Sequence, residues 1–184
     1  MLTLRPITAA DNAAVAHVIR TVMPEFDCVG EGFSINDPEV DDMYGTYTTP
    51  RSAFFVLERP TEADAAPTLT NSDSSTDAGT PSGGIVGCGG YAPLAGGDPK
   101  VCELRKMYLL PSARGLGGGR LIMDACLAGA RADGFARMYL ETVTAMKTAR
   151  AVYAKYGFEL LPGPLGATGH SGCDLFMMRS LGEA

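Results

Sequence analysis

The sequence predicts an α/β fold, and two observations support this prediction. Short runs of aromatic and β-branched residues, which favour strands, alternate with segments whose apolar residues recur at helical spacing. The length of 184 residues suits one domain with room for an insertion. We therefore expect residues 1–184 to form a single domain with the element order βααββ-βαβαββ.

The amino-terminal segment predicts a strand followed by a helix. Leucines alternate with polar residues over 2–6, and Thr8 and Asp11 stand at capping-box spacing before the helix. Pro24 is expected to end this helix because proline cannot continue the hydrogen-bond ladder. The apolar stripe of the helix comprises Val15, Val18, Ile19 and Val22.

A second helix, a strand and an insertion are expected next. Asp37 would cap the helix and Pro38 would occupy its first turn. Residues 52–58 are rich in aromatic and β-branched side chains and predict a buried strand. Residues 60–84 consist mainly of Ser, Thr, Asp, Ala, Pro and Gly, too little apolar surface to offset the entropy of ordering. We expect them to form a flexible loop inserted in the domain.

Two strands around a glycine turn follow the insertion. They are predicted at 85–91 and 101–109, and the turn at 96–98 joins them as a hairpin. In the second strand the apolar positions step from 104 to 107, which breaks strict alternation. This irregularity predicts a β-bulge near Arg105 and Lys106.

The carboxyl-terminal half alternates strands and helices. A glycine-rich turn at 111–120 leads into a helix that Gly134 ends, and a second helix ends at Gly157. The apolar stripe of the first of these helices comprises Leu121, Ile122, Ala125, Cys126 and Ala130. The remaining strands are predicted at 138–143, 158–161 and 174–178.

Charge and composition exclude several classes of function. The chain has 15 Lys and Arg against 21 Asp and Glu, a net charge of −6, whereas nucleic-acid binding needs a basic face. No secretory signal begins the chain and no apolar run reaches the ~18 residues that span a bilayer, so we expect no membrane partner. The five cysteines contain no CxxC pair, which argues against disulfides or zinc and favours a cytoplasmic location.

The glycine-rich turn has the features of an anion site. The first turn of a helix leaves amides without partners, and glycines let a ligand approach the backbone closely. Arg114 and Arg120 flank the turn and can bind phosphate. A nucleotide-hydrolysing loop does not fit, because no Lys-Ser or Lys-Thr follows the glycines. A dinucleotide site with Glu141 on the ribose, and a turn without ligand, stay open as alternatives.

Two motifs resemble the GNAT superfamily of acyl-CoA N-acyltransferases. The pyrophosphate loop of that family has Arg or Gln, then Gly three positions later and Gly or Ala five positions later, matched here by Arg114, Gly117 and Gly119. The helix-to-strand segment of the family is matched by Ala149, Tyr153, Gly157 and Phe158. Met146 departs from the pattern, because the family often has Asn there. The resemblance covers most of the chain outside 60–84.

The resemblance implies a mixed, mostly antiparallel sheet flanked by helices, with acetyl-CoA as cosubstrate and no metal. The coenzyme A pyrophosphate would bind the backbone of Arg114, Gly115, Leu116, Gly117, Gly118, Gly119 and Arg120. The pantetheine arm would pair like an added strand with Met107, Tyr108 and Leu109. The predicted bulge would splay this strand from the next and open a V for the arm.

The resemblance also implies catalytic roles. Tyr153 would be the general acid toward the leaving thiolate, with a merely packed tyrosine as the alternative. Glu103, just before the predicted bulge, is the candidate general base, and a solvated strand carboxylate is its alternative. Glu141 is the reserve base. A strand amide near Met107 would hold the oxyanion.

The acceptor site is expected beside the final strands. Phe33, Glu141 and His170 are the candidate substrate-binding residues, although ordinary loop structure would also account for His170. The acceptor lid would come from residues 26–33, with Tyr44 and Tyr47 nearby, and the acidic residues of this region suit a cationic acceptor or a solvated face. We expect direct transfer of acetyl to a primary amine of a small molecule or peptide in a ternary complex. A non-catalytic coenzyme A sensor is the alternative, and similar proteins are commonly homodimers.

Overall fold

The computed structural model describes residues 1–60 and 84–182. Its strands are β1 Thr3–Pro6, β2 Ala53–Arg59, β3 Gly84–Pro93, β4 Val101–Leu109, β5 Arg137–Thr142, β6 Glu159–Leu160 and β7 Leu175–Ser180. Its α-helices are α1 Asn12–Val22, α2 Met43–Tyr47, α3 Gly118–Ala132 and α4 Lys147–Lys155. Short 3-10 turns span Ala9–Asp11, Met23–Phe26, Ser34–Asn36, Pro38–Asp41 and Pro111–Ala113. Residues 61–83, most of the predicted insertion, lie outside the described part.

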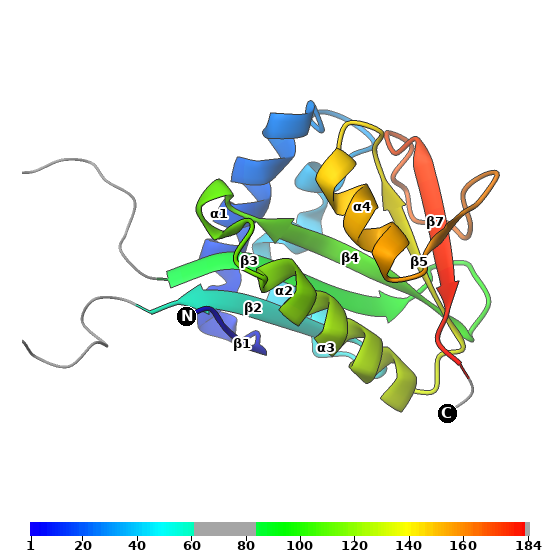
Figure 1. Cartoon of the computed structure of the whole chain (residues 1–184), viewed down its shortest axis with the longest axis horizontal. Coiled ribbons are helices and arrows are strands. Elements are labelled where there is room, and N and C mark those ends of the chain that lie inside the picture. Colours follow the sequence, from blue (N-terminus) through cyan, green and yellow to red (C-terminus); the bar gives the residue numbers. More distant parts are fainter. Residues whose placement is uncertain (61–83, 183–184) are drawn as a thin grey trace, which may run out of the picture.

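The strands form one seven-stranded sheet in the order β1-β2-β3-β4-β5-β7-β6 (Figure 1). Each neighbouring pair is antiparallel except β4 and β5, which run parallel. The predicted element order and the mostly antiparallel sheet are therefore confirmed. The parallel pair requires a crossover, which α3 supplies.

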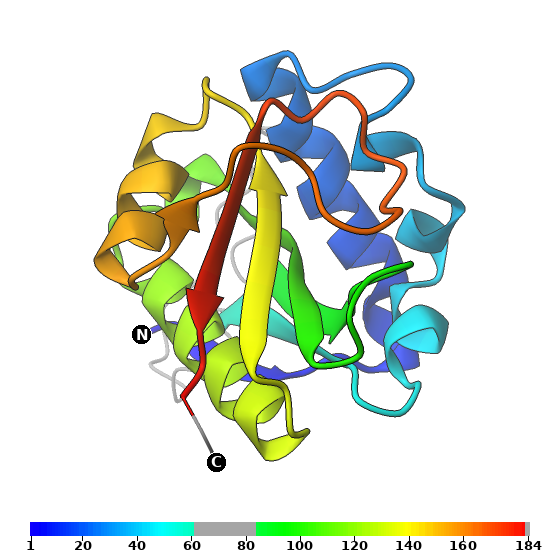
Figure 2. The same cartoon turned by 90° about the vertical axis from the view of Figure 1, so that its right-hand side faces the viewer.

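Helices cover both faces of the sheet, with α3 and α4 on one face and α1 on the other (Figure 2). The predicted stripe of α1 is buried, because each of its four members is at most 3% exposed. In α3, Ile122 and Cys126 are fully buried, but Leu121 is 41% exposed, so its place in the predicted stripe is wrong. No helix in the described ranges is long and apolar enough to cross a bilayer.

Asp11 joins the first helical turn to the edge of the sheet. Its carboxylate accepts hydrogen bonds from the Thr8 backbone amide at 2.7 Å and the Thr8 hydroxyl at 2.8 Å, at the predicted capping position. Arg5 on β1 donates to both oxygens of the same carboxylate, at 2.6 and 2.9 Å, and also pairs with Glu58 on β2. The Arg5 guanidinium lowers the pKa of Asp11 to about 2 although burial opposes the shift.

The predicted bulge lies at Lys106. Cys88 of β3 pairs with Tyr108, whereas Gly90 pairs with Arg105, so Gly89 alone faces two residues of β4. Lys106 adopts a φ of 52°, the left-handed conformation that an inserted residue requires here. A Cβ at Gly89 would stand 3.2 Å from the Met107 backbone and 2.7 Å from Ile122, so glycine allows this close approach.

The parallel strands β4 and β5 separate soon after they meet. Their pairing covers only Val101–Glu103 against Arg137–Tyr139, although β4 continues to Leu109 and β5 to Thr142. The V that we expected between the strands is thus present, and Glu103 is the last residue of β4 that pairs with β5.

The predicted second helix differs from the structure. Residues 38–41 form a 3-10 turn, and Asp37 makes no capping bond to it. Its carboxylate instead meets Lys106 and His170. These charged partners bind an anion more strongly than a neutral amide does. The short α2 is capped by Asp42, which accepts from the Gly45 amide at 3.1 Å.

The lowered pKa of Asp11 predicts a pH dependence of stability. The carboxylate stabilises the fold fully above its unfolded pKa of 3.8, and this stabilisation disappears as the pH falls through about 2. We expect wild-type protein to lose about 1 to 2 kcal/mol of unfolding free energy over that window through this group. Denaturant unfolding of Asp11→Asn should show a shallower pH slope; an unchanged slope would contradict the assignment.

Candidate active site

A cleft that is partly open to solvent, with a cavity volume of about 60 Å³, occupies the V between β4 and β5. The loop between β6 and β7 closes one side, where the Gly172 amide donates to the Gly32 carbonyl oxygen at 3.0 Å. Apolar side chains, among them Met23, Phe33, Val143 and Met146, line part of the cleft. The lining side chains that carry functional groups are Cys28, Ser34, Glu103, Arg105, Lys106, Tyr108, Glu141, Thr142, His170 and Cys173.

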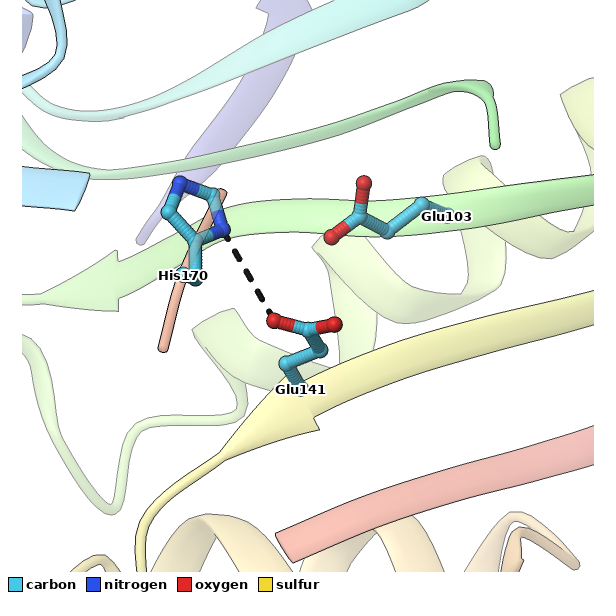
Figure 3. A group of neighbouring side chains, drawn as sticks. All are labelled: Glu103, Glu141 and His170. Carbon is cyan, nitrogen blue, oxygen red and sulfur yellow. Dashed lines mark ion pairs between the residues drawn. The ribbon is translucent and has the colours of Figure 1, made fainter. Parts of the chain in front are cut away.

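Three predicted site residues meet in this cleft. Glu103 comes from β4, Glu141 from β5 and His170 from the loop before β7, and one ligand atom of each lies within 4.8 Å of the others. Figure 3 shows all three side chains directed toward a common space. His170 Nδ1 is 3.8 Å from Glu141 Oε2, which is beyond hydrogen-bond distance. The sequence placed each residue near a cleft, and the structure brings their polar ends together.

The two carboxylates differ in their partners. Glu141 Oε1 accepts from the hydroxyls of Tyr139 at 2.8 Å and Thr168 at 2.9 Å. The other oxygen, Oε2, is buried and has no hydrogen-bond partner. Glu103 Oε2 lies 3.0 Å from Arg105 Nε, an ion pair without hydrogen-bond geometry. Burial raises the pKa of Glu103, and the nearby Arg105 charge opposes this shift.

Asp37, which sequence analysis assigned to a helix cap, belongs to the site. Its Oδ2 is 2.9 Å from His170 Nε2 and also pairs with Lys106 Nζ. Lys106, whose side chain is only 1% exposed, pairs with Glu39 at 2.9 Å as well. Burial raises the pKa of Asp37, but the bonds from His170 and Lys106 outweigh it and bring the pKa to about 2. Asp37 therefore stays ionised.

Tyr153 of α4 is buried, with 7% of its surface exposed. Its hydroxyl has no hydrogen-bond partner among the described residues, and burial raises its pKa to about 12. Tyr156 differs, because its hydroxyl donates to Asp124 at 2.7 Å on the outer side of α3. A protonated hydroxyl without a partner can donate to a group that enters from outside.

The turn before α3 presents unpaired amides. In the described chain, no backbone or side-chain oxygen accepts from the amides of residues 115–119. Gly115 and Gly117 have φ values of 74° and 82°, which favour glycine. A Cβ on Gly118 would stand 2.3 Å from Leu57, so glycine lets α3 pack against β2. This arrangement can bind an anion through the backbone.

The two arginines of the turn are differently placed. Arg114 donates to both carboxylate oxygens of Glu25, at 2.8 and 2.9 Å, and to the Leu109 carbonyl. Arg120 is exposed and pairs with Asp124 at 3.4 Å. The structure therefore provides an anion site made of amides, with Arg120 the more accessible of the two cations.

The structure places three other residues that the sequence analysis considered. Tyr47, expected near the acceptor, is buried in the core beside Phe54. Cys173 lines the cleft, where burial together with Glu141 raises the pKa of its thiol to about 12. Met146 also lines the cleft, and the Thr142 hydroxyl is 3.7 Å from its sulfur. Sequence reasoning placed Arg105 and Lys106 at the bulge but gave neither them nor Thr168 a role in the site.

The split parallel pair beside an amide-lined turn matches the acyl-CoA N-acyltransferase class that the motifs indicate. The acetyltransferase (GNAT) family model matches residues 36–158, and the chain belongs to this family. It is thus an acyl-CoA-dependent acetyltransferase with an acetyl-CoA-binding fold.

Individual relatives agree with this assignment. The chain is 37% identical to the uncharacterized N-acetyltransferase YjgM of Escherichia coli K12, over 97% of this chain and 94% of that protein. A GNAT-family acetyltransferase from Staphylococcus aureus Mu50 superimposes with a TM-score of 0.73 at 17% identity, covering 99% of this chain and all of the other. The structure of yncA from Salmonella typhimurium with its cofactor acetyl-CoA has a TM-score of 0.66 at 18% identity, covering 100% and 96%.

The ion pairs of Lys106 generate a stability prediction. Lys106→Met would leave the partly buried carboxylates of Asp37 and Glu39 without their cation. We expect a loss of about 3 kcal/mol in the free energy of unfolding, measured by denaturant titration. Arg20→Met is the matched control, because Arg20 pairs with Asp41 on the exposed surface and should change stability little. Equal losses of unfolding free energy in the two variants would show that the burial of Lys106 does not strengthen its ion pairs.

Proposed function

We propose that this acetyltransferase transfers an acetyl group to a primary amine of a small molecule or peptide by direct attack in a ternary complex. The observation that carries the proposal is the V between β4 and β5, which joins an amide-lined turn to a buried carboxylate pair. Acetyl-CoA supplies the acetyl group as an activated thioester. The whole chain would act as one catalytic domain.

The amide-lined turn supports a coenzyme site at residues 114–120. Unpaired amides and the positive end of α3 suit a pyrophosphate, and the first turn of α3 contains no acidic residue. Beyond Glu103, β4 has no strand partner on its β5 side, so Met107, Tyr108 and Leu109 can pair with the pantetheine arm. The Arg114 amide already donates to the Pro111 carbonyl oxygen at 3.3 Å and its side chain pairs with Glu25, so the unpaired amides of residues 115–119 would make the contact.

Glu103 and Tyr153 would move the protons. Glu103 is held at the point where the strands part, and its raised pKa suits a general base that takes a proton from the acceptor ammonium. Tyr153 keeps its proton at neutral pH and would give it to the departing sulfur. A backbone amide near Met107 would stabilise the oxyanion. The amine nitrogen thereby replaces sulfur on the acetyl carbon, and the second proton that this nitrogen loses would return through solvent to the Tyr153 oxygen.

Cys173 supports direct attack rather than an acyl-enzyme. A nucleophilic cysteine requires a thiolate, whereas the pKa of this thiol is raised to about 12. His170, the nearest histidine in sequence, is bonded through Nε2 to Asp37 instead.

Coenzyme binding provides the first test. Acetyl-CoA should raise the melting temperature of the wild-type protein, because a ligand that binds only the folded state stabilises it. NAD and ATP should have no such effect. Stabilisation by NAD or ATP alone would contradict the proposed site. Binding of acetyl-CoA without turnover of any amine in a broad screen would instead support a coenzyme A sensor.

Tyr153→Phe tests the proposed acid. Thiol release in an amine screen should slow by about 100-fold or more, the usual contribution of general acid catalysis, while acetyl-CoA binding persists. Tyr156→Phe is the matched control, since its hydroxyl contacts Asp124 and lies outside the proposed machinery. Normal turnover in Tyr153→Phe would remove this residue as the acid.

A further inference from the structure

We propose that Glu103, Glu141 and His170 form a three-acceptor site for the primary ammonium group of the acceptor, and that Asp37 positions His170 in it. The inference rests on the proposed function and deepens it, because it assigns the residues that select a primary amine. Asp37 acts through His170 and is a positioning residue.

The spacing of the three acceptor atoms fits an ammonium nitrogen. Because the atoms all lie within 4.8 Å of one another, some point lies no farther than 4.8 Å divided by √3, about 2.8 Å, from each of them. This is the length of a charge-assisted N–H to oxygen bond. A primary ammonium has three N–H groups besides its carbon substituent, one for each acceptor. Figure 3 shows the side chains converging from three directions.

Two of the three groups have a spare acceptor held in place by a second bond. Glu141 is fixed through Oε1 by two hydroxyls, which leaves the buried Oε2 without a partner. His170 is fixed through Nε2 by Asp37, whose pKa of about 2 makes it a pure acceptor. Nε2 must therefore carry the proton, and the neutral ring then has its lone pair on Nδ1. Nδ1 is the nitrogen that faces Glu141.

The local charge attracts a cation, and the spacing of the acceptor atoms suits an organic ammonium better than a metal ion. Glu103, Glu141 and Asp37 outnumber the two basic groups beside them, Arg105 and Lys106, so the cleft attracts a cation. A divalent metal needs ligand atoms about 2.0 to 2.2 Å away, and the 3.8 Å between His170 Nδ1 and Glu141 Oε2 is wide for two neighbouring ligands of such an ion.

The site predicts selectivity among amines. An N-methyl derivative of a substrate has one N–H fewer, so one buried acceptor would lose its partner. We expect wild-type kcat/KM to fall about tenfold or more from a primary amine to its N-methyl derivative, the effect of one missing bond to a charged group. Equal turnover of the two amines would overturn the three-acceptor site.

The tautomer of His170 can be measured without any substrate. The chain has two histidines, His17 and His170, so long-range ¹H–¹⁵N spectra of the ¹⁵N-labelled protein at mildly alkaline pH resolve both rings, and His17→Gln assigns them. We expect His170 in the Nε2–H form. An Nδ1–H form, or a doubly protonated ring, would overturn the proposal because neither offers a lone pair at Nδ1.

Asp37→Asn tests the positioning role, because the new amide can donate to Nε2 and move the proton to Nδ1. We expect the Nδ1–H form of His170 to appear in this variant. Its kcat/KM for primary amines should fall about tenfold or more, and its preference for primary amines over their N-methyl derivatives should shrink. Asp37→Glu should restore part of the kcat/KM and part of the preference for primary amines. Glu39→Gln is the matched control, since Glu39 shares Lys106 with Asp37 and has no bond to His170. Equal effects of Asp37→Asn and Glu39→Gln would assign the change to Lys106 and overturn the positioning role.

These measurements separate the inference from the proposed function. If no amine is acetylated, the proposed function fails whatever the tautomer. If primary and N-methyl amines are acetylated alike, the function stands and the three-acceptor site fails. Protection of the protein by Mg²⁺, Mn²⁺ or Zn²⁺ chloride in thermal unfolding, with loss of that protection in Glu141→Gln, would favour a metal site and overturn the inference.

Discussion

Parallel strands are held together by evenly spaced backbone bonds, and in this sheet the bonds between β4 and β5 stop after three residue pairs. The bulge at Lys106 turns β4 away at that point. A left-handed lysine costs about 1 kcal/mol or more, and it persists because its buried ammonium pairs with Asp37 and Glu39. The same ion pairs anchor the segment that contributes Phe33 and Ser34 to the cleft. Backbone geometry and buried charge therefore support each other at the site.

The charged groups of the cleft form a connected set rather than separate pairs. Asp37 contacts both Lys106 and His170, and His170 faces Glu141. Glu103 is balanced by Arg105 on the same strand. Buried charges of this kind are costly when one partner is missing. The set holds each acidic side chain in a defined direction before any ligand arrives, which reduces the ordering needed on binding.

Local patterns in the sequence were sufficient for the strands and the bulge, whereas the mostly antiparallel sheet and the V were implied by the resemblance to the family. Strand alternation that fails between 104 and 107 is a local signal, and it identified the bulge at Lys106 correctly. The role of Asp37 had no such signal, because its partners lie 69 and 133 positions away and Asp-Pro is also a normal helix start. Likewise, Arg114 pairs with a carboxylate 89 positions distant. Pairings between remote charged side chains depend on the assembled fold.

The outermost strands of the sheet are short, and this affects how the protein resists aggregation. β1 has four residues and β6 only two, and Pro6 ends the first of them. Short edges with proline offer little backbone for another chain to extend the sheet, so they protect the protein from edge-to-edge aggregation. In the described part of the chain, the longer stretch of β4 without a partner on its β5 side lies inside the sheet, beyond Glu103. The protein thus keeps its open strand edge in the interior, where a slender ligand can reach it and a second folded sheet is excluded by the flanking elements.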